Sequence, residues 1–285
     1  MLTRNYPIHI YAAAFFFIFT GCQANKEKTT HPSPAGYDLQ NPTVIKLNSA
    51  LIEISGISFY AKDSTVFAIE DEDGVFSKIY LNKNAQVKNW RFDKTHDYED
   101  LVLFDSTFYI LISNGDIETL QFKGDSMVTT KTKYPGSDKV TNEFESLYYD
   151  DSLRLLIMIC KDCKDDKKNA VSAWGFNIDS LTYTPDLFSI DESAFKGKLG
   201  KEKFKPSAAA INPVTNELYI LSSVNKLLVI SGRKGNVKDV FDLDPKNFKQ
   251  PEGITFTPTG DLLISNESAD LGPANILIFK RKKKG

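Results

Sequence analysis

The sequence is poor in histidine, cysteine and tryptophan and has no marked excess of either charge. Its 285 residues include three His, three Cys and two Trp, and 35 Lys and Arg stand against 37 Asp and Glu. A near-neutral chain creates no strong positive field, so we do not expect nucleic acid as a partner. The 20 Phe and 12 Tyr, together with β-branched residues in short runs, favour strands over helices.

The scarcity of histidine bears on catalysis. His9 and His31 belong to the N-terminal segment, which leaves His96 alone in the rest of the chain. A Ser-His-Asp arrangement needs partners for that one ring, and the sequence identifies none. Hydrolysis is therefore disfavoured, although His96 beside Asp97 stays open as a general base.

The apolar run at residues 11–19 is too short to cross a bilayer as a helix. It follows Arg4 and ends before Thr20-Gly21-Cys22, which resembles a bacterial lipobox. The sequence therefore predicts a lipoprotein signal peptide over residues 1–21 and acylation of Cys22, which anchors the chain to a membrane. We expect a cell-envelope protein, held at the outer membrane on its periplasmic or surface side.

Residues 22–42 are polar, contain three prolines and offer almost nothing to bury. Such a composition predicts a flexible tether, so the folded domain is expected to cover residues 43–285.

Five related stretches recur in that domain, each followed by an apolar run, a polar turn and a second apolar run. Their anchor residues are Ser55, Glu99, Glu145, Ser207 and Glu252, at spacings of 44, 46, 62 and 45 residues. Periods near 45 residues with four short strands each are typical of β-propeller blades. In the first unit the strands are predicted at Gly56–Tyr60, Thr65–Glu70, Lys78–Leu81 and Lys88–Phe92. The long third unit is expected to carry a polar insertion around residues 186–203, for which a helix is one of the forms that the sequence allows.

The last unit lacks an outermost strand, because only residues 280–285 follow the apolar run at Asn275–Phe279. Thr43–Leu47 is strand-like, and we predict that it pairs with the last blade and closes a five-bladed ring. The alternative is an open solenoid, which would leave sheet edges that need capping.

The five units resemble the SdiA-regulated (YjiK-like) family. The residues that carry the resemblance are Ile54–Ile57, Asp97–Leu101, Glu143–Leu147, Pro206–Ala209 and Gln250–Ile254. The resemblance implies an all-β, five-bladed, NHL-like β-propeller that is exported or membrane-anchored, with a calcium site at a shared position and no established activity. The fourth unit departs from the family pattern, since Ser207 is followed by Ala208 in place of glycine.

The start of the first strand and the end of its antiparallel partner lie at the same end of a blade. One face should therefore collect the anchor residues and a second ring 14 to 16 residues later, made of Asp71, Asn114, Lys161, Ser223 and Asn266. We expect Glu72, Asp73, Asp116 and Glu267 beside this ring, with Glu267 outside the inner ring, so this face should be acidic.

Carboxylates gathered near one axis repel each other and raise each other's pKa unless a cation intervenes. Ca²⁺ accepts six to eight oxygen ligands and tolerates a mixed shell. Together with the calcium site that the resemblance implies, this predicts a calcium ion held by Glu99, Glu145 and Glu252. The alternative is that each glutamate accepts backbone N–H groups of the next blade and only fixes packing.

Cys160 and Cys163 form a Cys-x-x-Cys motif, which in a reducing compartment suggests a redox or zinc site. No second cysteine pair or nearby histidine completes a zinc shell, and no βαβ pattern surrounds the motif. In an exported protein we expect a local disulfide or two free thiols.

Two functions remain open. The first is a lipid-anchored, calcium-binding module that binds or scaffolds an unknown protein or small molecule. The second is a metal-dependent hydrolase, of the lactonase, esterase or phytase kind, that uses the same central funnel. They differ in the ion, because a structural ion is fully ligated by protein and a catalytic ion keeps a position open. We favour the first.

Overall fold

The computed structural model describes residues 31–47, 51–82, 85–94, 96–124, 126–137, 142–164, 166–268 and 272–282. The predicted signal peptide, Cys22 and the first part of the predicted tether lie outside these residues. Residues 31–285 form a compact unit of their own. Within the part of the chain that the structure describes, no helix is long and apolar enough to cross a membrane.

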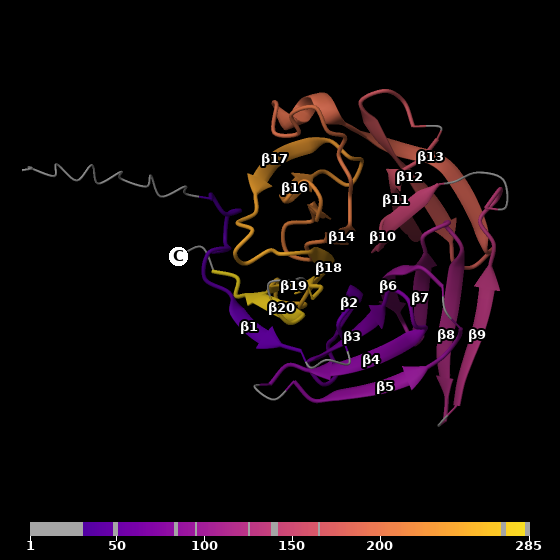
Figure 1. The fold of residues 1–285 in the computed structure, drawn as a ribbon. Coiled ribbons are helices and arrows are strands. Elements are labelled where there is room, and N and C mark those ends of the chain that lie inside the picture. Colours follow the sequence, from indigo (N-terminus) through magenta and orange to yellow (C-terminus); the bar gives the residue numbers. More distant parts are fainter. Residues whose placement is uncertain are drawn as a thin grey trace, which may run out of the picture. The chain divides into compact units, whose positions relative to one another are not determined.

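Five four-stranded antiparallel sheets follow one another around a central axis (Figure 1). Blade 1 contains β2 (Ile54–Tyr60), β3 (Thr65–Glu70), β4 (Val75–Tyr80) and β5 (Val87–Arg91). Blade 2 contains β6 (Tyr98–Phe104), β7 (Thr107–Ile112), β8 (Ile117–Lys123) and β9 (Ser126–Thr132). Blade 3 contains β10 (Glu143–Asp150), β11 (Leu155–Asp162), β12 (Ala170–Asn177) and β13 (Thr182–Asp191). Blade 4 contains β14 (Ala208–Ile211), β15 (Leu218–Ser222), β16 (Leu227–Ser231) and β17 (Val237–Asp242).

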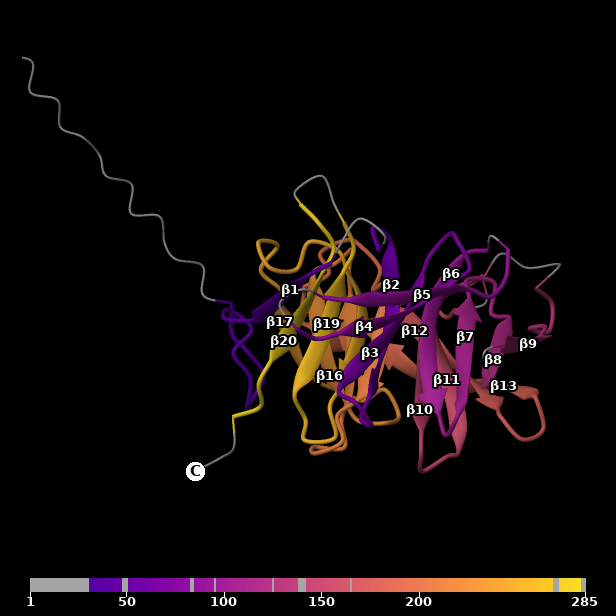
Figure 2. The ribbon, with the colours of Figure 1, turned by 90° about the horizontal axis from the view of Figure 1, so that it is seen from below.

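Blade 5 is completed by a strand from the other end of the chain. Its strand order is β1 (Thr43–Lys46), β20 (Asn275–Phe279), β19 (Leu262–Asn266) and β18 (Pro251–Phe256). β1 lies antiparallel beside β20, with Val44 opposite Leu277 (Figure 1, Figure 2). The first strands of neighbouring blades pack together in the cycle β2, β6, β10, β14, β18 and back to β2. The predicted closure of a five-bladed propeller is therefore confirmed.

Two-residue alternation explains why the inner strands are apolar on both faces. In β3, Val66 and Ala68 point into the core shared with blade 5, while Phe67 and Ile69 point into the core shared with blade 2. Successive side chains of a strand face opposite sides of the sheet, so a blade held between two others needs both sets to be apolar.

The structure shifts some predicted strand ends. β3 has the predicted bounds, but β4 begins at Val75 and not at Lys78. Gly74 adopts φ +37°, a conformation that favours glycine, and so reverses the chain earlier than the sequence suggested. The expected insertion is a long β13 followed by a 3₁₀ helix at Glu192–Phe195, whose Phe195 is buried against Phe204.

The predicted tether extends too far toward the domain. Tyr37 and Leu39 are buried in the core between blades 4 and 5. The Tyr37 hydroxyl donates to the Gly260 carbonyl at 2.6 Å and accepts a hydrogen bond from Asn212 Nδ2 at 2.9 Å. The segment from Tyr37 onward therefore belongs to the folded unit. Two apolar residues among polar ones form no period, so this contact could not be predicted from the local pattern.

Candidate functional site

The anchor glutamates lie in β-bulges. Between β6 and β7, Tyr98 lies opposite Ile112 and Asp100 opposite Leu111, so the register skips Glu99. The ladders of blades 3 and 5 skip Glu145 and Glu252 in the same way. A bulge leaves one residue unpaired and turns its side chain away from the regular alternation. In three blades that residue is a glutamate.

These side chains meet in one cavity at one end of the axis, which we call the central cavity. It has a volume of about 260 Å³ and is lined by Ser55, Asp71, Asp97, Glu99, Glu143, Glu145, Lys161, Ser207, Glu252 and Glu267. The prediction that Glu99, Glu145 and Glu252 converge agrees with this lining. The volume leaves room for a cation with several waters.

The tightest group of carboxylates lies between blades 1 and 2. One oxygen each of Asp71, Asp97 and Glu99 lies within 4.8 Å of the other two. The backbone holds this group, since the Tyr98 N–H donates to the Asp71 carbonyl at 2.8 Å. Asp71 Oδ1 is buried and accepts no hydrogen bond from an N–H or O–H donor of the residues that the structure describes, while the Asp71 carboxyl group faces that of Asp97 within hydrogen-bonding reach. An oxygen in that state is suited to a cation ligand.

Glu145 already has a positive partner. The ammonium group of Lys161 makes a short hydrogen bond to Glu145 and lies 3.8 Å from a carboxylate oxygen of Glu143. Lys161 is the one basic side chain that lines the central cavity, among the residues that the structure describes.

Glu252 has a serine hydroxyl as its neighbour. The Ser223 side chain hydrogen-bonds its carboxyl group. Ser207 fixes the adjoining backbone, because its hydroxyl donates to the Pro251 carbonyl at 2.8 Å and accepts the Ser223 N–H at 3.2 Å.

Glu267 also lines the central cavity. Its N–H donates to the Gln250 carbonyl at 2.9 Å, and its carboxylate accepts from Gln250 Nε2 at 2.9 Å. These two bonds bring the residue after β19 next to the start of β18.

Burial, and after it the neighbouring charges, raise the pKa of several carboxyl groups in the cavity. Burial, followed by the charges of Glu145 and Asp97, raises the pKa of Glu99 to about 10. Burial, followed by Glu145, raises the pKa of Glu252 to about 8. Burial and the neighbouring Asp97 raise the pKa of Asp71 to about 7. The metal-free cavity therefore holds protons at neutral pH, and a cation that binds there has to displace them.

The alternative packing role belongs to Asp100 and not to the glutamates. Asp100 is 3% exposed, and its Oδ2 accepts the N–H of Leu147 in the next blade at 2.8 Å. Blade 1 has Gly56 at the equivalent position, where an added Cβ would lie 2.3 Å from Asp100 Oδ1. The residue after the anchor thus joins the blades, which leaves the anchor side chain free to face the cavity.

Six predicted members of the acidic face do not line the central cavity, namely Glu72, Asp73, Asn114, Asp116, Ser223 and Asn266. Asn114 Oδ1 accepts the Asp116 N–H at 2.9 Å, and Asp116 Oδ1 accepts the Tyr134 N–H at 2.8 Å. Asn266 is fully buried and donates to the Asn247 carbonyl at 3.1 Å. The side chains of Asn114, Asp116 and Asn266 thus fix turns and strand ends.

Two cavity residues were missed as site residues. Asp97 and Glu143 line the cavity, and each precedes an anchor glutamate by two residues. Because strand side chains repeat every two residues, this spacing was the available signal.

The histidine alternative is not supported by the geometry. His96 lies beside Asp93 and Lys131. Its Nε2 is 3.4 Å from Asp93 Oδ2 and 2.9 Å from Lys131 Nζ. It does not line the central cavity, although its neighbour Asp97 does.

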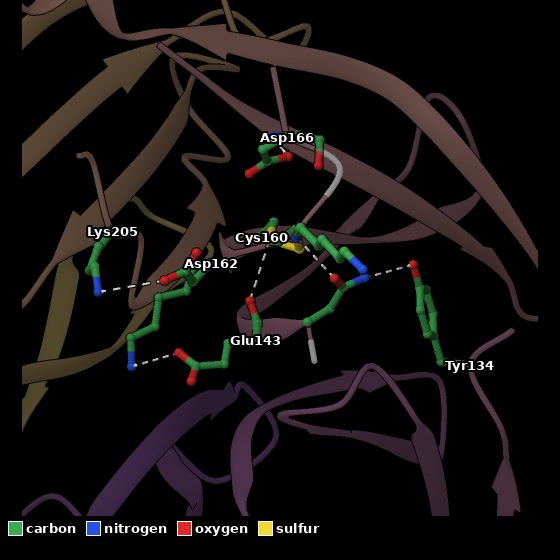
Figure 3. The surroundings of a disulfide bond; sticks show 11 residues. Tyr134, Glu143, Cys160, Asp162, Asp166 and Lys205 are labelled. Atoms are coloured by element: carbon green, nitrogen blue, oxygen red, sulfur yellow. Dashed lines mark hydrogen bonds and ion pairs between the residues drawn. A yellow bond between two sulfur atoms is a disulfide. The ribbon is translucent and has the colours of Figure 1, made fainter. Parts of the chain in front are cut away.

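Cys160 and Cys163 form a disulfide (Figure 3). Asp166 lies near both sulfur atoms, but disulfide sulfurs are not thiolate ligands, and its Oδ1 accepts the Ser172 N–H at 3.1 Å. The motif is therefore a local disulfide and not a zinc site.

Solved structures with similar folds share little sequence with this chain. A putative glucose dehydrogenase from Thermus thermophilus aligns with a TM-score of 0.53 at 10% identity, over 84% of this chain and 100% of that one. The calcium-binding protein regucalcin from Agrobacterium tumefaciens aligns with a TM-score of 0.52 at 13% identity, over 88% and 96%. A luciferin-regenerating enzyme gives 0.50 at 13% identity, over 86% and 96%. At these identities the likeness shows the propeller fold alone.

The comparison with curated protein sequences finds no match. The family model described as SdiA-regulated matches residues 38–270, which span most of the chain from the segment before β1 to the end of β19. With five blades, a ring closed by β1 and the anchor residues in register, the chain belongs to the SdiA-regulated family.

Proposed function

We propose that the protein is a lipid-anchored β-propeller of the bacterial cell envelope that binds calcium in its central cavity and serves as a binding or scaffold module. The observation that carries the proposal is the group formed by Asp71, Asp97 and Glu99, in which a buried oxygen of Asp71 accepts no hydrogen bond from an N–H or O–H donor of the described residues. The wider cavity has seven carboxylates and one lysine, a balance that favours a divalent cation. Regucalcin, whose fold is similar, is named as a calcium-binding protein.

Calcium suits this site better than magnesium. The available oxygens belong to carboxylates and hydroxyls on several blades, and their arrangement is irregular. Ca²⁺ accepts such shells at about 2.3–2.6 Å, whereas Mg²⁺ requires a small, near-octahedral shell. Asp71, Asp97 and Glu99 would supply the first oxygens, and Glu145 and Glu252 would complete the charge around the ion.

The test measures thermal unfolding of chelator-treated protein with and without calcium. At a calcium concentration of 100 times Kd the ion should add about 2.7 kcal/mol. For a domain of this size that raises Tm by about 5–10 °C. Glu99→Gln cannot ionise when the ion binds and has nearly the same shape, so it should reduce the rise by at least half.

Glu72→Gln is the matched control, because Glu72 is exposed, directly follows Asp71 and does not line the cavity. It should keep the full response to calcium. If metal-free wild-type protein melts at the same temperature with and without calcium, and titration calorimetry detects no binding, the cavity is not a calcium site.

A metal-dependent hydrolase would use the same cavity, and its volume leaves space beside one ion. Such an enzyme needs an ion with a position open to water. Calcium-loaded protein should then hydrolyse a lactone, an aryl ester or a phosphate ester, and Glu99→Gln should abolish the activity. The module that we favour predicts no turnover of these three substrates.

A further inference from the structure

Lys161 faces Glu145 because both residues are unpaired in their strands. Glu143 lies opposite Asp162 and Phe144 opposite Cys160, so the ladder skips Lys161. Ser146 then lies opposite Ile159, so the ladder skips Glu145. Two bulges on adjacent strands thus turn one cation and one anion toward the same point in the central cavity.

The charge of Lys161 acts on the whole cavity. Its ammonium group contacts Glu145 and lies 3.8 Å from Glu143. This positive charge lies among the carboxylates of the central cavity and opposes their attraction for a divalent ion.

The disulfide closes the chain around this lysine. Cys160 precedes Lys161, Cys163 follows two residues later, and both sulfurs are buried, with exposures of 0% and 6%. Cys160 Sγ also lies 3.5 Å from the carbonyl oxygen of Glu143, on the strand that carries Glu145 (Figure 3). Lys161 has no partner in the strand ladder, so the disulfide between its neighbours Cys160 and Cys163 is the covalent constraint on its position.

We propose that Lys161 competes with the divalent cation for the central cavity and that the Cys160–Cys163 disulfide positions it, so that the cavity binds calcium more tightly once the disulfide is lost. This inference rests on the proposed function, because it assigns the competitor at the same site. Lys161 is then a specificity-determining residue, and the two cysteines are positioning residues.

The competition follows from the charges. An ion attached to Asp71, Asp97 and Glu99 shares the cavity with the Lys161 ammonium, and two positive charges in a small, partly buried volume repel each other. While the disulfide holds Lys161 on Glu145, the ion meets this repulsion and also lacks one carboxylate. When the lysine can leave, Glu145 becomes available to the ion.

The oxidation state of the pair would then adjust the affinity. Reduction transfers two electrons and two protons to the disulfide and gives two thiols, while a dithiol reductant closes into its own disulfide. No residue that lines the central cavity changes its covalent structure in this step.

The experiment measures the calcium Kd by titration calorimetry for wild-type protein, Lys161→Met, the double variant Cys160→Ser/Cys163→Ser, and the triple variant. Lys161→Met should lower Kd by about tenfold or more, since it removes a charge of the same sign as the ion. The double variant should also lower Kd, by a smaller factor. The triple variant should match Lys161→Met alone, because the disulfide acts through the lysine.

Lys205→Met is the matched control, since Lys205 pairs with Asp162 at 4.0 Å but does not line the cavity. Its Kd should equal that of wild-type protein. An unchanged Kd in Lys161→Met would overturn the competition. A double variant that tightens binding equally with and without Lys161 would overturn the positioning role.

A second measurement needs no calcium. Acetylation of metal-free protein, followed by mass spectrometry, gives the labelling rate of Lys161 relative to Lys280, whose side chain is 77% exposed. Cys160→Ser/Cys163→Ser should raise the relative rate several-fold, and an unchanged rate would contradict the positioning role. If that variant fails to fold, wild-type protein treated with a dithiol takes its place.

The two measurements separate the proposals. Failure of both wild-type protein and Lys161→Met to bind calcium would overturn the proposed function and the competition, while labelling still decides whether the disulfide positions Lys161. Calcium binding by Lys161→Met alone would support the competition and show that the intact cavity excludes the ion.

Discussion

Glu99, Glu145 and Glu252 occupy equivalent bulges, yet each has a different neighbour. Glu99 joins Asp71 and Asp97, Glu145 takes the ammonium group of Lys161, and Glu252 takes a hydroxyl group. The repeats therefore place three like side chains in one cavity without giving it fivefold symmetry. A cation at the tightest carboxylate group would lie toward blades 1 and 2 and away from the axis.

The raised pKa values predict how the metal-free protein responds to pH. In the folded protein the pKa values of Glu99 and Glu252 are about 10 and about 8, against 4.5 for an unperturbed glutamate. Between pH 5 and pH 9 the folded state therefore binds more protons than the unfolded state, and the free energy of unfolding falls as pH rises. Melting in chelator should occur at a lower temperature at pH 9 than at pH 6.

Two controls belong to this measurement. Glu99→Gln cannot ionise and should flatten the decline between the two pH values. Saturating calcium should also reduce the decline, because a bound cation stabilises the ionised carboxylates. Equal melting temperatures of the metal-free wild type at pH 6 and pH 9 would contradict the raised pKa values.

At this scale the sequence predicted which residues converge but not how they pair. The repeat register was sufficient to bring Glu99, Glu145 and Glu252 together. The pairing of Lys161 with Glu145 depends on two bulges on adjacent strands, and no local residue pattern predicted these bulges. The role of Asp100 in joining two blades depends on a neighbour in another sheet, Leu147.

At the scale of elements, β1 shows how a distant strand completes a sheet. Ile45 is buried, at 8% exposure, in the core between blades 5 and 1, whereas its neighbour Val44 is 48% exposed. Ile45→Ala removes buried apolar groups and should lower the free energy of unfolding by about 2–4 kcal/mol. Val44→Ala on the other face should change it by about 0.5 kcal/mol or less. Denaturant melts of both variants measure the difference.

Removal of the whole strand gives a stronger test. Deletion of residues 43–47 leaves β20 with an unpaired edge and should lower Tm well beyond the effect of Ile45→Ala. Deletion of residues 23–30 should leave Tm unchanged. A deletion of 43–47 that melts like wild-type protein would show that the ring does not depend on β1.

The two segments before the first blade differ in how far the sequence could predict their contacts. β1 was predictable because the last unit had one strand too few. The docking of Tyr37 was not, because its partners Asn212 and Gly260 lie in blades 4 and 5, far along the chain. A contact of this kind has no local period, and only the folded ring brings its members together.

At the scale of the whole molecule, the five repeats were enough to predict the propeller. The last repeat lacked one strand, and the segment before the first repeat could supply it, so the closure of the ring was also predictable.

The membrane anchor belongs to the same scale and remains a prediction. Cys22→Ala should move the protein from the membrane fraction to the aqueous fraction, because it removes the site of acylation. Mass spectrometry of membrane-extracted wild-type protein should find acyl chains on Cys22, and an unmodified residue would contradict the anchor.

The pairing of β1 with β20 also determines when the molecule can finish folding. Thr43 meets Ile278, so the closing sheet needs segments from both ends of the chain. During synthesis the first four blades can form before β20, the partner of β1, has been made. The ring can close only after residue 279 has been synthesised. The last step of folding is thus the most non-local one, and contacts of large sequence separation form slowly. A prematurely terminated chain would keep β1 as an open strand edge, available to proteases and quality control.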